Sequence, residues 1–246
     1  MVTIPGQFNG PADSGNGGWV CGLLAEEWQR THGNGPVEAT LRQPPPLESP
    51  LIWEHDGTDL RLVTAGGALI AEAQPGTFAP GDPPSVSLAE AERGRDAYAG
   101  FHHHPFERCF TCGPRRAAGD GLRLFAGPVA DGVAATPWQA DPAFDTGDGT
   151  ISLPVTWAAI DCSGSWATVD QGPLPPMLLG RMSGIVDRRP EVGEPLIALG
   201  WLRKRDGRKL HTSTALTKPD GEVLARSDQV WITVAAAPAP TPDQSG

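Results

Sequence analysis

LPVTWAAIDCSGSWATV, residues 153–169, is the stretch from which the fold can be predicted. It is apolar on almost every side, and Pro154 stands where a helix can begin, because the first helical turn does not need the N–H that proline lacks. A helix that is apolar all round is usually buried. The stretch therefore predicts a buried central helix, and Asp161 is the single acid within it.

A carboxylate in such surroundings is costly unless it is paired, hydrated at a cleft or protonated. Asp161 can lie at a polar rim of the helix, or cap a break near Ser163 and Gly164. It can also lie on the floor of a cleft and take part in chemistry. The rest of the chain favours this third interpretation.

Composition narrows the classes of function. A formal charge of -10 argues against nucleic acid or an anionic membrane as the main partner. No apolar run approaches the roughly 20 residues of a membrane span, and the first residues lack the features of a signal peptide. We therefore expect a cytoplasmic protein in which the four cysteines are thiols.

The chain divides into two similar units, residues 1–75 and 120–234, joined by a connector at 76–119 and followed by a tail at 235–246 with the composition of a disordered segment. Each unit has a helix, at 14–29 and then at 153–169, followed by an antiparallel meander. Asp-Gly and Gly-Gly pairs between apolar alternations predict the hairpins. Further strands are expected at 2–8 and from residue 122, and a short helix at 88–99.

An internal repeat relates the two units. At an offset of 145 residues, VEATLRQPPPLESPLI (37–52) lies over MSGIVDRRPEVGEPLI (182–197) without a gap. Pro45 and Pro50 then meet Pro190 and Pro195. A period near half the chain predicts two similarly folded halves.

This order of elements resembles the double-hotdog acyl-CoA thioesterase-like family of the hotdog superfamily. The resemblance covers residues 1–75 and 120–234. It implies an α+β double hotdog, in which two antiparallel sheets each wrap around a long central helix and form a pseudo-dimer within one chain. It leaves a homo-oligomer of such chains open.

Asn16-Gly17-Gly18 is the first motif that carries the resemblance. Many hotdog thioesterases open the central helix with a polar residue and two glycines, and Asn16 stands where histidine is common. Glycine lets a ligand approach the backbone, and the N–H groups of a first helical turn suit an oxyanion. The alternative is that the glycines only permit a tight turn or close helix packing.

Asp161 is the second motif. In single-hotdog thioesterases an acid about nine residues along one helix faces the glycines of the partner subunit. If the second helix begins at Ser152, Asp161 lies nine residues on, and Ala25 is the matching residue of the first unit. Leu153 and Pro154 replace the glycines. Each half then supplies half of one composite site.

The repeat offset conflicts with this alignment, because 145 residues separate Asp161 from Asn16 rather than from Ala25. The half-site hypothesis therefore requires the loop after the second helix to be about nine residues longer than the loop after the first.

The implied reaction is hydrolysis of an acyl thioester, carried by CoA or by an acyl-carrier protein. The substrate carbonyl binds the N–H groups of Gly17 and Gly18 beside Asn16, and Asp161 activates water as a general base or attacks directly to form an anhydride. Five further residues are expected around the water and the acyl group, although buried tryptophan is as often plain core: Trp19, Thr156, Trp157, Ser163 and Ser165.

CoA phosphates would need a local basic patch on this acidic chain. The basic clusters are Arg115-Arg116, Arg181, Arg188-Arg189, Arg203-Lys204-Arg205 and Arg208-Lys209, each of which can equally be an ordinary solvated surface.

We expect no cofactor, with one alternative in the connector. Cys109 and Cys112, together with His103 and His104, have ligand types found in zinc sites. The alternatives are a redox pair, for which no thioredoxin-like βαβ context is present, and simple packing of the connector against the body, which is the more common role of such residues. Cys21 and Cys162 are expected to be small buried hydrophobic residues.

Two other functions remain open. Hotdog hydratases and dehydratases combine an Asp with a His, and Asp161 has no histidine close by in sequence. A non-catalytic acyl-CoA-binding protein is compatible with Asn16 in place of His and with the absence of an acid at Ala25.

Overall fold

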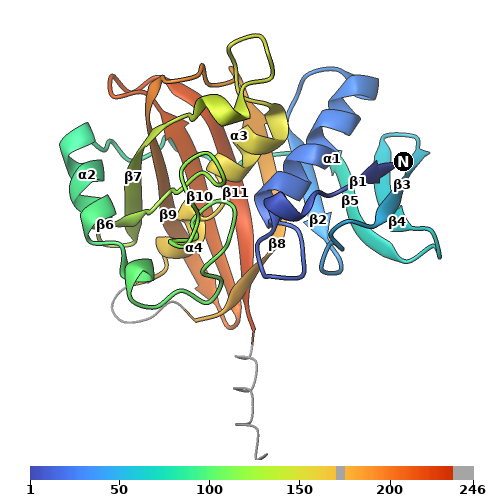
Figure 1. Ribbon diagram of the computed structural model, residues 1–246, viewed down its shortest axis with the longest axis horizontal. Coiled ribbons are helices and arrows are strands. Elements are labelled where there is room, and N and C mark those ends of the chain that lie inside the picture. The colour runs from blue at the N-terminus through green and yellow to red at the C-terminus, as the bar shows by residue number, and fades with distance from the viewer. Residues whose placement is uncertain (170–174, 235–246) are drawn as a thin grey trace, which may run out of the picture.

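A single antiparallel sheet of 11 strands organises the computed structural model, which describes residues 1–169 and 175–234 (Figure 1). The order is β1-β3-β4-β5-β2-β8-β11-β10-β9-β7-β6. The expected tail at 235–246 lies outside the described residues. The first half contributes β1 (Val2–Thr3), a 3-10 turn (Gly6–Phe8), α1 (Gly17–His32), β2 (Val37–Leu41), β3 (Pro50–Asp56), β4 (Asp59–Thr64) and β5 (Leu69–Pro75).

The remaining elements follow the first half in chain order. They are α2 (Leu88–Asp96), a 3-10 turn (Ala99–Phe101), β6 (Gly127–Ala130), β7 (Val133–Gln139), a 3-10 turn (Pro142–Phe144), α3 (Leu153–Ala159), α4 (Ser163–Trp166), β8 (Met177–Val186), β9 (Pro195–Asp206), β10 (Lys209–Thr217) and β11 (Val223–Thr233). Two predicted strands are wrong in extent. Residues 2–8 form only a two-residue strand and a 3-10 turn, and the strand expected from residue 122 begins at Gly127.

The expectation of two separate sheets is wrong, because β2 of the first half pairs with β8 of the second half. Residues 37–40 of β2 pair antiparallel with residues 181–184 of β8, so that the two halves share one sheet. Glu38 lies opposite Ser183, which is 145 residues further along the chain. The repeat offset therefore places equivalent residues face to face at the centre of the joined sheet.

The two faces of the sheet bury different helices. Helices α1 and α3 lie side by side over one face, where the larger hydrophobic core is found (Figure 1). Helix α2 packs on the other face, against Ile197 and Leu199 of β9, whose side chains alternate with those of Leu196 and Ala198 in the larger core. Period-two alternation along β9 thus lets one strand serve two layers.

The single helix predicted at 153–169 is broken. Helix α3 ends at Ala159 and α4 begins at Ser163, because long-range hydrogen bonds capture the carbonyls between them. The Ile160 carbonyl accepts bonds from Thr214 Oγ1 at 2.6 Å and from Gln229 Nε2 at 2.7 Å. The turn that carries Asp161 is therefore held by the sheet beneath it.

None of the helices in residues 1–169 and 175–234 combines the length and the apolar character needed to cross a membrane.

Candidate active site

The N-terminus of α1 is fixed by Asn16, which caps the helix. Its side-chain Oδ1 accepts a hydrogen bond from the Trp19 N–H at 2.9 Å. Such a cap leaves other N–H groups of the first turn unpaired, and these carry the partial positive charge of the helix end. The predicted helix start at Asn16-Gly17-Gly18 is confirmed.

Asp161 faces this helix end from the other half of the chain. Its Oδ2 accepts hydrogen bonds from the Gly18 N–H at 3.0 Å and from Asn16 Nδ2 at 3.1 Å. Asp161 is 1% exposed. The structure thus brings together Asp161, Asn16 and the glycines, which the half-site hypothesis requires.

Glycine is needed at residue 18 for steric reasons. A Cβ at Gly18 would lie 2.4 Å from Asp161 Cβ and 2.9 Å from the Trp157 carbonyl oxygen. Such contacts cannot form without displacing a helix. Gly18 therefore sets the close approach that lets its N–H reach the carboxylate.

Two polar groups beside this contact have no hydrogen-bond partner among the described residues. One is Asp161 Oδ1, which is buried. The other is the Gly17 N–H, since α1 begins at this residue and no preceding carbonyl accepts from it. The expectation that Gly18 also offers a free N–H is wrong, because Asp161 Oδ2 occupies it.

Asp161 and Gly17 line one pocket of about 220 Å³ with mostly apolar walls. The wall residues that give this character are Leu41, Phe106, Trp166, Met177, Leu179 and Trp231. The two residues that carry the unpaired N–H and the unpaired carboxylate oxygen therefore border an apolar space, which suits a ligand with one polar group and an apolar chain.

Burial and, to a smaller extent, the charge of Cys109 raise the pKa of the Asp161 carboxyl to about 7. Hydrogen bonds from Gly18, Asn16 and Cys162 act in the opposite direction by stabilising the carboxylate. The two protonation states of Asp161 are therefore close in free energy near neutral pH, a property typical of acid–base groups in enzymes.

Gln229 and Thr214, on the strands of the sheet, hold the backbone around Asp161. Gln229 Nε2 donates to the carbonyl oxygens of both Ile160 and Asp161, at 2.7 and 3.2 Å, and its Oε1 accepts from Trp231 Nε1 at 2.7 Å. These bonds fix the backbone on both sides of the carboxylate. Sequence analysis missed this role, because no local pattern links β11 to residue 161.

Of the five residues expected around the substrate, the pocket includes only Ser165, whose hydroxyl donates to the Cys162 carbonyl at 2.8 Å. Trp19 instead stacks on Phe8, with ring centroids 4.4 Å apart. Thr156 donates back to the Ser152 carbonyl at 2.9 Å.

The other two substrate candidates also belong to the core. The Trp157 ring packs close to Gly184, and its indole N–H is buried without a hydrogen-bond partner among the described residues. Ser163 lies against Gly200, and its hydroxyl is similarly unpaired there. The apolar wall from Phe106 and Trp231 could not be foreseen, because both come from distant segments.

The connector residues fall into two groups. His104, Cys109 and Cys112 line the pocket beside Asp161. His103 is exposed and lies outside the pocket. Cys162 is not merely a hydrophobic filler, because its Sγ lies 3.8 Å from that of Cys109.

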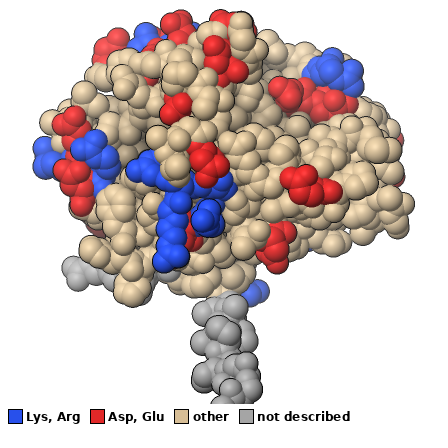
Figure 2. Space-filling model, in the orientation of Figure 1, with Lys and Arg blue, Asp and Glu red and all other residues tan. Residues whose placement is uncertain are grey.

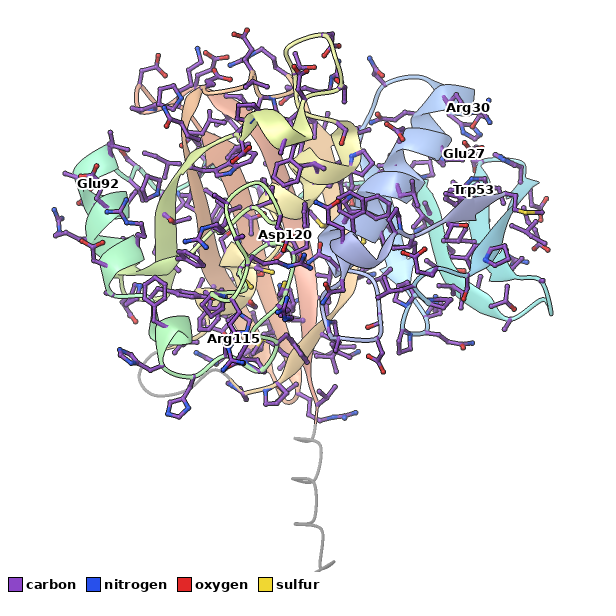
Figure 3. All side chains as sticks on the ribbon, viewed as in Figure 1. Glu27, Arg30, Trp53, Glu92, Arg115 and Asp120 are labelled. Atoms are coloured by element: carbon purple, nitrogen blue, oxygen red, sulfur yellow. The ribbon has the colours of Figure 1, made fainter. Side chains whose placement is uncertain are left out.

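Most of the basic clusters are neutralised by neighbouring acids. Ion pairs join Arg115 to Glu107, Arg116 to Asp120, Arg181 to Glu38, Arg188 to Glu194 and Arg189 to Asp148. Figure 2 nevertheless shows Lys and Arg side chains gathered over the connector loops, and Figure 3 places Arg115 and Asp120 there. Arg203 and Arg205 donate to backbone carbonyls.

Comparison with known proteins gives evidence at the level of structure alone. No protein-family model and no curated protein matches the sequence. Among solved structures, a tesB protein of Mycobacterium avium subsp. paratuberculosis aligns over 95% of this chain and 91% of its own, with a TM-score of 0.60 and 12% identity.

Two further structures align over 95% of this chain. A candidate thioesterase from Novosphingobium aromaticivorans gives a TM-score of 0.59 at 11% identity over 94% of its length. A protein of unknown function with the hot dog fold from Alicyclobacillus acidocaldarius gives 0.57 at 11% identity over 92% of its length. At this identity the likeness concerns the fold, and on that evidence the chain is a hotdog-fold protein.

Proposed function

We propose that this protein hydrolyses acyl thioesters of the acyl-CoA type. The observation that carries the proposal is the contact between Asp161 and the start of α1. One carboxylate oxygen is anchored by Gly18 and Asn16, the other is buried and unpaired, and Asp161 lines an apolar pocket. An anchored carboxylate beside a helix N-terminus combines a base with an electrophilic N–H.

In the proposed mechanism the thioester carbonyl accepts a hydrogen bond from the Gly17 N–H. Asp161 Oδ1 takes a proton from a water molecule, whose oxygen attacks the carbonyl carbon. The charge that develops on the carbonyl oxygen is stabilised by the N–H and by the helix end. The C–S bond then breaks, and the departing thiolate takes the proton from Asp161.

The site is composite in the sense of a pseudo-dimer. The first half supplies the helix end with Asn16 and Gly17, and the second half supplies Asp161 on the turn after α3. The joined sheet and the packing of α1 against α3 support this division of labour.

The pocket supports an apolar acyl group, since aromatic side chains from the connector, α4 and β11 border it. For the carrier we propose CoA, whose phosphates would meet an exposed arginine of the connector. Arg108 is exposed and lies between Phe106 and Cys109, both of which line the pocket. We therefore propose Arg108 as a contact for the phosphates.

Hydration of an enoyl group is less well supported than hydrolysis. His104 lines the same pocket as Asp161. However, its Nδ1 accepts from the Phe106 N–H at 2.9 Å, and its Nε2 lies 3.3 Å from Cys112 Sγ. Both ring nitrogens are thus engaged, which leaves no free nitrogen on His104 to act as the second catalytic group.

A panel of short, medium and aromatic acyl-CoA esters, followed by detection of the free thiol, tests the proposal. We expect thiol release that depends on enzyme concentration for at least one apolar acyl chain. Enoyl-CoA is included with absorbance detection of its double bond. Binding without thiol release, or loss of the double bond instead, would contradict hydrolysis.

The carrier is tested with Arg108→Ala against Arg95→Ala, an exposed arginine of α2. An exposed charge contact is worth about 0.2–1 kcal/mol, so we expect KM for acyl-CoA to rise by about 1.4- to 5-fold in Arg108→Ala only. The matching acyl-pantetheine, which lacks the nucleotide phosphates, should show no such difference. Equal effects on both substrates would rule out phosphate recognition by Arg108.

A further inference from the structure

Three cysteine sulfurs meet beside the proposed active site. The Sγ atoms of Cys109, Cys112 and Cys162 all lie within 4.8 Å of one another, and all three residues are buried. Two come from the connector and the third from the turn that carries Asp161. Zn–S bonds of about 2.3 Å in a tetrahedron place sulfurs about 3.8 Å apart, and Cys109 and Cys162 are separated by 3.8 Å.

A tight turn in the connector brings both Cys109 and Cys112 to this cluster. The Gly113 N–H donates to the Cys109 carbonyl at 2.9 Å, which closes a tight turn around Cys112. A Cβ at Gly113 would lie 2.6 Å from both the nitrogen and the oxygen of Cys109. The turn therefore requires glycine directly after the second cysteine.

Nitrogen donors face two of the three sulfurs. Asn16 Nδ2 donates to Cys109 Sγ at 3.7 Å. His104 Nδ1 accepts from the Phe106 N–H, so in the neutral ring the proton lies on Nε2, 3.3 Å from Cys112 Sγ. A thiol is a weak acceptor, whereas a metal-bound thiolate attracts such donors.

Neither a disulfide nor plain hydrophobic packing accounts for this geometry. A disulfide would need sulfurs about 2.05 Å apart and would leave the third cysteine without a role. Hydrophobic packing gives no reason for N–H groups to face sulfur. Three thiolates at this distance would repel one another unless a cation lay between them.

We propose that Cys109, Cys112 and Cys162 bind one Zn²⁺ ion. Soft thiolate ligands favour zinc over magnesium or calcium. Three Zn–S bonds form as three thiol protons leave to solvent. The cysteines all line the pocket, so that a water molecule there completes the coordination.

Zinc at this position is a positioning device for the acid. It ties the connector to Cys162, the residue that follows Asp161, and it holds Cys109 against Asn16, which anchors the carboxylate. The two contacts place the metal in the second layer of side chains around the proposed base. The inference rests on the sulfurs themselves and does not require the chain to be a hydrolase.

Metal analysis of the full-length protein tests the site. The protein is loaded with zinc, freed of excess by dialysis and assayed for bound metal. We expect one zinc per chain in the parent protein and in Cys21→Ala, whose cysteine is buried on α1 outside the cluster. Cys112→Ala should lose the bound zinc. No retained zinc in the parent, or equal retention in both variants, would overturn the proposal.

Cobalt substitution keeps the test decisive if Cys112→Ala does not fold. With one Co²⁺ per parent chain we expect the ultraviolet charge-transfer band of thiolate–cobalt bonds and the strong visible bands of a tetrahedral ion. Addition of zinc should abolish both. A cobalt spectrum without the thiolate band would show that the cysteines are not the ligands.

Discussion

The starts of α1 and α3 occupy equivalent places in the two halves, yet only one of them has the chemistry of a site. Both helices begin with a polar cap, Asn16 or Ser152, each of which accepts from a backbone N–H three residues on. Asp161 faces the first helix start. Ala25, nine residues after Asn16, is its counterpart by sequence position in the first half. The repeat therefore contains two capped helix starts, but an acid at the position of Asp161 in only one of its halves.

Sterics maintain the difference between the two places. Gly18 makes room for Asp161 at the start of α1. At the start of α3 the backbone of Gly22 lies close, since a Cβ at Gly22 would lie 2.6 Å from Pro154 Cα. The second helix start is thus closed by direct backbone packing.

Among the variants, Asp161→Asn should have the largest effect on activity, because it removes the group that distinguishes the first helix start from the second. This change removes the base but keeps the shape, and Asn Oδ1 can still accept from Gly18 and Asn16. We expect kcat to fall by about 10²- to 10⁴-fold with the fold retained. Thiol release from the preferred acyl-CoA measures the loss, and circular dichroism measures the fold.

The mirror variant Ala25→Ser is the control for Asp161→Asn. It changes the equivalent buried residue of the first half, and we expect kcat to remain that of the parent protein. A fall in activity as large as that of Asp161→Asn would mean that both places contribute to catalysis.

Gly18→Ala tests the close approach of the two halves. Its Cβ would overlap Asp161, so we expect a loss of unfolding free energy of about 1–3 kcal/mol together with a loss of activity. The counterpart Pro154→Ala removes a ring from the other helix start and should cost activity little. Thermal unfolding and kcat are measured for both. Full activity in Gly18→Ala would contradict the proposed geometry.

The two helix caps give the smallest and most closely matched comparison. Asn16→Ala and Ser152→Ala each remove a cap, at a cost of about 1 kcal/mol of stability. Only Asn16 also donates to Asp161 Oδ2, at 3.1 Å. Because a hydrogen bond to a charged group is worth about 1.5–3 kcal/mol, kcat should fall about tenfold or more in Asn16→Ala alone.

Asn16→Ser separates the two roles of this residue. Serine is an equally good cap but has no amide to donate to the carboxylate. Stability should therefore stay close to that of the parent protein while kcat falls. If Asn16→Ser keeps the parent rate, the bond to Asp161 has no part in catalysis.

Sequence reasoning reached the parts of the molecule that depend on local pattern and on the repeat. The caps Asn16 and Ser152 are 136 residues apart, whereas Glu38 and Ser183, paired at the centre of the sheet, are 145 apart. The nine extra residues that the half-site hypothesis requires therefore lie between α3 and β8. This resolves the conflict between the two alignments.

Long-range contacts decided what the sequence could not reveal. The break after α3 depends on Thr214 and Gln229, which lie more than 50 residues away from the carbonyl that they bind. The sulfur cluster joins Cys109 and Cys162 across 53 residues, and only the Cys-x-x-Cys spacing gave a signal. The merging of the two sheets depends on hydrogen bonds between the edges of β2 and β8, which no periodicity encodes.

The most direct test of one composite site per chain is a calorimetric titration of the Asp161→Asn protein with its preferred acyl-CoA, which this variant should bind without turnover. We predict that one molecule binds per chain. Binding should be lost when Gly17→Leu is added, because Gly17 lines the pocket and leucine is the residue at the equivalent first position of α3, Leu153. Two molecules bound per chain, or unchanged binding in a folded Gly17→Leu variant, would contradict a single composite site.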